Sequence, residues 1–287
     1  QQKRKPRSPL MIALVLVVIL LIISAAGLLG YAQVLRPMQI RANATATAQT
    51  IATNEAHASA TADARATATE NAQLTATAVA NVTATAQAQA TAEANQAVLT
   101  QATGGAPTID ESLAQNSNSN WAEGTATDGS CQFTGGAYHI NIHTTNVFLP
   151  CFATNTGFTN FAMQVNMTIV SGNEGGLIFR ADPNANHFYI FRITSDGTFD
   201  LAKFVDNTGK NTVVLSDGVD PSIHTGTGKT NTISIVARNN KIYLYVNKHF
   251  LGSASDGAYT SGQLGLFAGD SKVATEASFQ NLKVWTL

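Results

Sequence analysis

The chain has 287 residues, a formal net charge of −1 and only 12% charged residues. This balance lacks the basic surplus with which nucleic-acid-binding proteins neutralise phosphates, so no nucleic-acid partner is implied. The charge is uneven along the chain, however. Every charged residue from Lys3 to Arg41 is basic, whereas acidic residues outnumber basic ones after Thr103. The asymmetry fits a basic flank on one side of a membrane and an acidic portion on the other.

An apolar run from Leu10 to Ile23, resumed at Leu28 and Leu29, contains no charged residue. A helix of about 20 apolar residues crosses the roughly 30 Å hydrocarbon core of a bilayer, so the run predicts a transmembrane helix over residues 10–31. The alternative is a cleaved signal peptide, because the small residues 24–26 resemble a cleavage site.

The basic residues around this run favour one orientation in the membrane. Four of them precede it and two follow it: Lys3, Arg4, Lys5 and Arg7, then Arg36 and Arg41. Because basic flanks stay inside, residues 1–9 are expected to be cytoplasmic and the C-terminal portion extracytoplasmic, at the cell surface. The chain starts with Gln1 rather than Met, so a preceding cytoplasmic domain stays an open expectation.

Residues 32–103 form a low-complexity stalk, rich in Ala and Thr, without Gly, Pro, Lys, Cys or aromatic residues from Ala42 onward. Such a composition excludes a packed core. Alanine favours a long helix of on the order of 90 Å, a spacer, whereas threonine weakens that preference and leaves a disordered tether or a strand as alternatives. Ile40 and Ile51 are eleven residues apart, which hints at a coiled coil and hence a homo-oligomer.

Cys131 and Cys151 are the only cysteines, and both lie in the portion that the apolar helix would export. Because oxidising compartments favour disulfides, we predict a bond between them. The alternative is a pair of buried free thiols.

After Pro107 the sequence changes to short alternating segments separated by Gly, Asn and Asp. In residues 161–169 the odd positions are apolar and the even ones polar or small, which is typical of a half-buried strand. Asn239-Asn240 predicts a tight hairpin. Strands are expected at 138–143, 161–169, 176–180, 188–194, 199–205, 212–215, 233–237, 242–246, 263–268 and 278–285. With no helical run among them, these segments predict a two-sheet sandwich over 121–287, after a linker at 104–120.

Several segments of the head follow one another in a recognisable order. They are Gly175-Gly-Leu-Ile-Phe-Arg180, Phe188-Tyr-Ile-Phe-Arg192, Asp196-Gly-Thr-Phe199, Leu244-Tyr-Val-Asn247 and Phe279-Gln-Asn-Leu-Lys-Val284. This succession resembles the concanavalin A-like jelly roll of the laminin G and family 16 glucanase type, including keto-disaccharide hydrolase-like modules. The layout of anchor, stalk and sandwich also resembles exported modules of bacterial membrane proteins. The resemblance implies an all-β, lectin-like head.

Catalytic acids are not evident in the head. Retaining glucanases of the resembling superfamily carry paired glutamates in a Glu-x-Asp-x-(x)-Glu pattern, because the nucleophile and the acid must lie about 5 Å apart. The glutamates of the head are isolated in the sequence: Glu111, Glu123, Glu174 and Glu276. Asp196 and Asp200 flank a turn glycine and are interpreted as turn residues. We therefore expect no enzyme activity by that mechanism.

Two loop aspartates are candidate Ca²⁺ ligands, Asp182 in residues 181–186 and Asp270 in residues 269–271. Carboxylate oxygens suit Ca²⁺, and loops of laminin G-type domains supply them in this way. No other metal or cofactor is implied.

Four side chains are candidate ligand-binding residues: Arg180, Arg192, Tyr243 and Tyr245. The two tyrosines alternate with apolar residues, so they point away from the core and are expected to be exposed. Tyrosine rings stack on sugar rings, and arginine hydrogen-bonds hydroxyls or carboxylates. The alternative is that loops or the other sheet cover this face, which would make these residues structural.

The sequence thus predicts a single-pass membrane protein whose extracytoplasmic head binds a glycan or a surface protein. One alternative is a glycoside-cleaving enzyme that uses a carboxylate such as Glu174 or Asp182. Another is a structural subunit, in which Ala-rich helices bundle and the heads form a surface layer or fibre.

Overall fold

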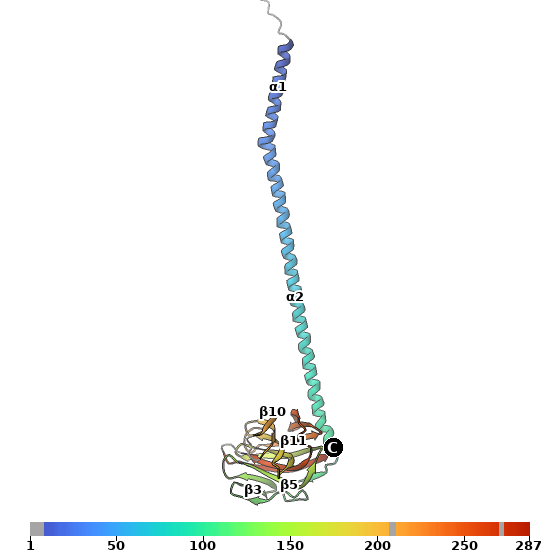
Figure 1. The fold of residues 1–287 in the computed structure, drawn as a ribbon, viewed down its shortest axis with the longest axis vertical. Coiled ribbons are helices and arrows are strands. Elements are labelled where there is room, and N and C mark those ends of the chain that lie inside the picture. The colour runs from blue at the N-terminus through green and yellow to red at the C-terminus, as the bar shows by residue number, and fades with distance from the viewer. Residues whose placement is uncertain (1–8, 207–210, 270–272) are drawn as a thin grey trace, which may run out of the picture. The chain divides into compact units, whose positions relative to one another are not determined.

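The computed structural model describes residues 9–206, 211–269 and 273–287. These residues divide into two compact units, one reaching to Ala84 and the other spanning Thr85–Leu287. The first unit is helical, and the second contains the strands and the end of the last helix (Figure 1). Each unit is described by itself.

Helix α1 spans Pro9–Gly30, a π-helical segment spans Tyr31–Leu35, and helix α2 spans Arg36–Ala102. Among the described residues, one helix is long and apolar enough to cross a membrane, and its apolar part is α1. The large apolar side chains described in α1 are exposed. A signal sequence has the same length and composition.

The helical form predicted for residues 32–103 is confirmed. Hydrogen bonds of the threonine hydroxyls show how the helix accommodates so many threonines. Many Thr hydroxyls donate a hydrogen bond to the carbonyl four residues earlier, as Thr45 does to Arg41 (2.9 Å) and Thr67 to Asp63 (2.9 Å). The hydroxyl is thereby satisfied without leaving the helix, although such bonds stabilise a helix little. The Ala-rich surroundings supply the propensity that threonine lacks.

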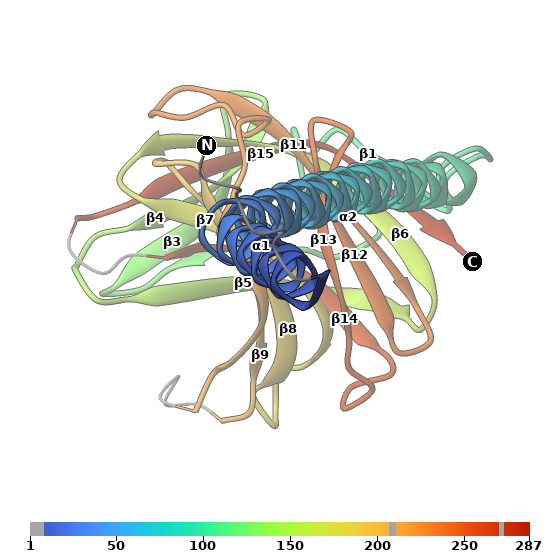
Figure 2. The ribbon, with the colours of Figure 1, turned by 90° about the horizontal axis from the view of Figure 1, so that it is seen from above.

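The second unit consists of two antiparallel sheets. Among the described residues, the larger sheet has nine strands, in the order β13 (His249–Ser255), β12 (Lys241–Val246), β11 (Thr230–Arg238), β6 (Phe161–Ser171), β15 (Glu276–Thr286), β4 (Ala137–Ile142), β3 (Gly129–Thr134) and β2 (Gly124–Thr125), with β1 (Ile109–Glu111) also pairing with β15. The smaller has six: β10 (Val213–Val219), β9 (Thr198–Phe204), β8 (His187–Thr194), β7 (Glu174–Asp182), β14 (Gly262–Gly269) and β5 (Phe148–Phe158). In Figure 2, β8 lies beside β9 and β12 beside β13.

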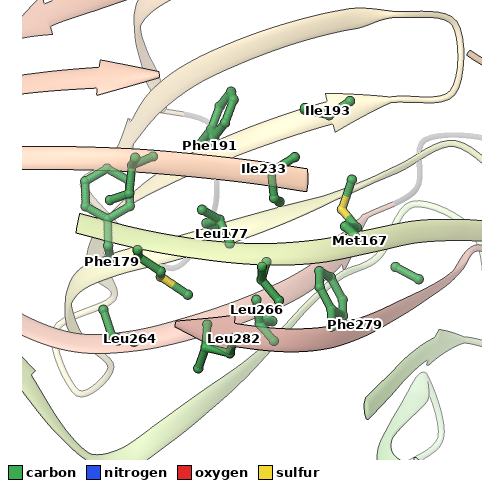
Figure 3. Close-up of a cluster of buried hydrophobic side chains, with 14 of the residues drawn as sticks. Met167, Leu177, Phe179, Phe191, Ile193, Ile233, Leu264, Leu266, Phe279 and Leu282 are labelled. Atoms are coloured by element: carbon green, nitrogen blue, oxygen red, sulfur yellow. The ribbon is translucent and has the colours of Figure 1, made fainter. Parts of the chain in front are cut away.

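The main core lies between the two sheets. Figure 3 shows Phe179, Phe191 and Leu266 of the six-stranded sheet meeting Met167 and Phe279 of the nine-stranded sheet. All five are buried, because each occupies an inward position of an alternating strand. The predicted all-β sandwich is confirmed.

The predicted disulfide is also confirmed. Cys131 in β3 and Cys151 in β5 are bonded, with their Cα atoms 6.3 Å apart. β3 belongs to the nine-stranded sheet and β5 to the six-stranded sheet, so no backbone hydrogen bonds pair these two strands. The disulfide therefore links the two sheets covalently.

All ten predicted strands correspond to observed ones, and the Asn239-Asn240 hairpin connects β11 to β12 with Asn239 at φ 54°. The prediction missed the short strands β1 and β2, and also β3, β5 and β13. Pro150 and Gly157 interrupt β5, and β13 is rich in small residues, so neither shows the period of two. The unit containing both sheets begins at Thr85, earlier than the residue 121 expected for the head.

Candidate functional site

Tyr243 and Tyr245 lie on the outer face of the nine-stranded sheet, as the alternation of β12 predicts. Tyr245 is nevertheless fully buried, so its expected exposure is wrong. Its hydroxyl donates to the Asn95 carbonyl at 2.7 Å, and burial raises the pKa of this phenol. Tyr243 is half-buried, with the Lys241 Nζ 5.8 Å from its ring centroid.

The end of α2 covers this face of the sheet. Leu99 and Ala102 are buried against Val236, Tyr245 and Trp285. The Gln96 side chain donates to the Lys248 carbonyl, and the Trp285 Nε1 donates to the Gly105 carbonyl. The two tyrosines therefore pack against the end of α2 and do not form an exposed surface for a sugar ring.

Arg180, the third candidate ligand-binding residue, is also buried, with 1% of its surface exposed. It lies in a β-bulge of β7, at φ 48°, which turns its side chain away from the outer face. Its guanidinium donates to the carbonyls of Thr159 (2.6 Å) and Tyr259 (3.4 Å), and burial lowers its pKa. Arg180 therefore ties two loops together.

The Asp182 carboxylate accepts hydrogen bonds from the backbone N–H groups of Asn184 and Ala185, as the cap of a turn does. Asp270 lies outside the described residues. Within residues 9–206, 211–269 and 273–287, no group of three or more His, Cys, Asp or Glu side chains could hold a metal ion.

The outer face of the six-stranded sheet carries a cluster of aromatic rings. Its members are Phe148, Phe152, Phe188, Phe204 and Phe267. The ring centroids of Phe148 in β5 and Phe204 in β9 lie 5.1 Å apart, although three strands separate these two. Neighbouring strands are about 4.8 Å apart, so a flat sheet would place β5 and β9 roughly 19 Å from each other. This face of the sheet is therefore hollowed.

Arg192 lies on the same face, on β8, between carboxylates from both neighbouring strands. Its Nε donates to Asp200 Oδ1 of β9 at 2.6 Å, and its Nη1 donates to Glu174 of β7 at 3.2 Å. Burial lowers the pKa of Arg192, but the hydrogen bond to Asp200 and the charge of Glu174 outweigh it, so the net pKa is raised. The guanidinium is thus permanently charged and fixed in direction.

One donor group and one acceptor atom at this cluster are not used by the described residues. The Nη2 of Arg192 has no hydrogen-bond acceptor among them, and its side chain is 33% exposed. Asp200 is 9% exposed, and its Oδ2 is buried without a donor in the described part of the chain. A buried polar atom without a partner costs about 1–3 kcal/mol, and more when the group is charged.

A cavity of about 540 Å³ opens beside Arg192 and is lined by residues of β8, β9 and β10. Its lining includes the charged residues Arg192, Asp200 and Asp217 and the apolar residues Phe199, Val214 and Val219. Val214 and Val219 are 54% and 73% exposed. The cavity is within the range of small-ligand sites and joins a few polar groups to an apolar wall. We call it the Arg192 cavity.

Of the four predicted ligand-binding residues, only Arg192 lies at this cavity, and its partner Asp200 was misinterpreted as a turn residue. Asp200 lies within β9, where Phe199 and Leu201 face the core. The hairpin turn at Asp196 contains the signal for the pairing: Arg192 and Asp200 lie equally far from it and are direct cross-strand partners. Nothing local in the sequence indicates Glu174 as the third member, because it comes from the preceding strand.

No protein-family model matches the sequence, and no curated protein sequence matches it. Solved structures resemble the sandwich. The carbohydrate binding module CBM66 from Bacillus subtilis shares 22% identity over 58% of this chain and 91% of its own, with a TM-score of 0.41. A protein with a galectin-like fold from Bacillus subtilis shares 13% identity over 63% of this chain and 96% of its own, with a TM-score of 0.49.

The β-glucanase of Bacillus licheniformis shares 11% identity over 64% of this chain and 99% of its own, with a TM-score of 0.43. All three are concanavalin A-like sandwiches of the kind that the sequence resembles. Since each identity is below 25%, the likeness concerns the fold alone and transfers neither a ligand nor a reaction to this chain.

Proposed function

We propose that this protein is a membrane-anchored glycan-binding protein whose ligand occupies the Arg192 cavity. The observation that carries the proposal is a pair of residues that both line that cavity: Arg192, whose Nη2 is a donor without an acceptor among the described residues, and Asp200, whose Oδ2 is an acceptor without a donor among them. Neighbouring hydroxyls of a sugar suit this pair, because a hydroxyl both accepts from a guanidinium and donates to a carboxylate.

The valines at the lining of the cavity fit the apolar side of a sugar ring. Val214 and Val219 are exposed there. Sugar rings carry C–H groups on their faces, so burying them against valines gains roughly 25 cal/mol per Å² of apolar surface. A site that combines polar groups with aliphatic side chains supports binding of a sugar ring.

The membrane part of the proposal rests on α1. Its apolar length suffices to span a bilayer, and the basic residues that precede it favour a cytoplasmic N-terminus. In that orientation the disulfide between Cys131 and Cys151 lies in an oxidising compartment, where such bonds persist. The glycan would then belong to the envelope or to the surroundings of the cell.

Glycoside cleavage is the second candidate function, because Glu174 and Asp200 both lie within hydrogen-bond distance of the same guanidinium. Two carboxylates at close range are what retaining glycosidases require. Here, however, both carboxylates accept hydrogen bonds from Arg192, whereas a general acid must present a proton to the leaving oxygen. The geometry therefore favours binding over cleavage.

A glycan panel tests the proposal. The detergent-solubilised full-length protein is applied to immobilised glycans, beside Arg192→Ala and Arg238→Ala. Arg238 is an exposed arginine of the other sheet and serves as the matched control. We expect wild type and Arg238→Ala to bind the same glycans, and Arg192→Ala to bind them at least about tenfold more weakly, a difference of 1.4 kcal/mol. Binding that survives Arg192→Ala would contradict the proposal, as would a panel on which nothing binds.

The same glycans separate binding from cleavage. After incubation with wild type, reducing ends are measured over hours, with Glu174→Gln and Asp200→Asn as controls. Binding alone predicts no new reducing ends. If wild type produces reducing ends and Glu174→Gln or Asp200→Asn does not, the protein is a glycoside-cleaving enzyme and the proposal of binding alone is wrong.

A further inference from the structure

The Arg192 cavity carries more negative than positive charge. Arg192 is the cation of the cluster, and it is shared between Glu174 and Asp200. Asp217 adds a third carboxylate at the lining of the cavity. The charged side chains that line the cavity in the described part of the chain, Arg192, Asp200 and Asp217, therefore sum to a formal charge of −1.

The placement of Asp200 and Asp217 is costly without a further cation. The two residues are direct cross-strand partners in the pairing of β9 with β10, and both line the cavity. Side chains so placed have Cβ atoms about 5 Å apart, and like charges at that distance destabilise a sheet. Arg192 donates to Asp200 Oδ1 only, so Oδ2, the buried and unpaired oxygen, is left for another donor.

We propose that the ligand is a glycan that carries a protonated amino group, as glucosamine does and N-acetylglucosamine does not. This inference rests on the proposed function. An ammonium group has three donors and one positive charge, so it satisfies Asp200 Oδ2 and lowers the repulsion between Asp200 and Asp217. A neighbouring hydroxyl then accepts from the Arg192 Nη2.

The same charges select against other ligands. An acidic sugar would bring its carboxylate toward Asp200 and Asp217, and Arg192 is the cation that the described lining offers to attract it. Like-charge contacts of this kind cost binding free energy. A neutral sugar satisfies the hydrogen bonds but leaves the repulsion between the two aspartates. The amino sugar is therefore the ligand class that the cavity favours.

The test compares two oligosaccharides that differ only in the amine. Glucosamine tetramers and N-acetylglucosamine tetramers are titrated calorimetrically into the detergent-solubilised full-length protein at low salt. We expect the glucosamine tetramer to bind at least about tenfold more tightly. Asp217→Asn should reduce this preference to about threefold or less, because it removes one carboxylate and leaves Arg192 in place.

Asp110→Asn is the matched control, since Asp110 is an exposed aspartate paired with Lys283 on the other sheet, and it should keep the full preference. Equal affinities for the two tetramers, or a preference that Asp217→Asn leaves intact, would overturn the amino-sugar inference. The proposed function would survive that outcome if other glycans bind in an Arg192-dependent manner. If no glycan binds at all, both fail together.

Discussion

Asp256 holds three segments together at one end of the sandwich. Its carboxylate accepts hydrogen bonds from the Lys203 Nζ (2.6 Å), the Tyr189 hydroxyl (2.5 Å) and the Ala258 N–H (2.9 Å). Burial raises the pKa of Asp256, but these hydrogen bonds outweigh it, and the pKa lies below its usual value. Burial and the bond to Asp256 raise the pKa of Tyr189 to about 12, so its hydroxyl remains a donor at neutral pH.

Because the pKa of Asp256 is lowered in the folded protein, the free energy of unfolding depends on pH in the acidic range. Because the folded-state pKa lies below the unfolded value of about 3.9, the ionised carboxylate stabilises the fold above that pH, and the stabilisation is lost as the pH falls further. In Asp256→Asn we expect the free energy of unfolding to be about 3 kcal/mol lower at pH 7, and to fall less steeply below pH 4 than in wild type. Denaturant titrations at several pH values measure both effects. Parallel pH profiles for wild type and variant would contradict the assignment.

Gly176 leaves room beside Arg192 on the hollowed face. A Cβ atom at this position would lie 2.0 Å from the Phe191 carbonyl and 2.8 Å from the Phe267 ring. We expect Gly176→Ala to lower the free energy of unfolding by about 1–3 kcal/mol, because overpacking shifts the backbone. Gly157→Ala, where a Cβ meets nothing within 4 Å, is the control and should change little. Thermal denaturation compares them, and equal melting temperatures would refute the packing argument.

At the scale of elements, the end of α2 belongs to the same compact unit as the sheets. Leu99 is 4% exposed against the nine-stranded sheet, whereas Leu74 on the same helix is 63% exposed. Large-to-small changes at buried leucines cost about 2–5 kcal/mol. We therefore expect Leu99→Ala to lower the melting temperature of the sandwich and Leu74→Ala to leave it unchanged. If both variants melt alike, the helix end does not contribute to the stability of this unit.

Most elements follow from local patterns in the sequence, because a strand with one face in a core must alternate. Residues 161–169 and 242–246 show this alternation and form strands. The packing of α2 on the nine-stranded sheet cannot be predicted from the sequence of β12. Alternation indicates which way Tyr243 and Tyr245 point but not what covers them. The sequence feature that could have predicted this packing lies in the helix: Val98 and Leu99 are two consecutive large apolar residues just before its end.

The candidate site was only partly predictable for a similar reason. The cavity depends on tertiary placement: β7 contributes Glu174, β8 Arg192, β9 Asp200 and β10 Asp217. Hairpin register predicts Arg192 opposite Asp200, but the hollow of the sheet is a property of all its strands. Arg180 shows that alternation can also predict the wrong face. A bulge in β7 redirects a side chain that simple alternation would place on the outer face.

At the scale of the whole molecule, the orientation in the membrane is a prediction from the apolar helix and its flanking charges. When intact cells that produce the protein are treated with an external protease, we expect the portion containing Cys131 and Cys151 to be degraded and an N-terminal fragment to be retained. A cytoplasmic marker protein must stay intact as the control. Protection of the C-terminal portion in intact cells, with degradation only after lysis, would contradict this orientation.

The proposed glycan site is tested most directly by hydrogen exchange of the full-length protein with and without a bound oligosaccharide from the panel. Binding at the Arg192 cavity should slow exchange in β8, β9 and β10, whose residues line it, and leave β12 and β13 unchanged. Slower exchange confined to β12, β13 or any segment away from the cavity, with β8 to β10 unaffected, would contradict the proposal.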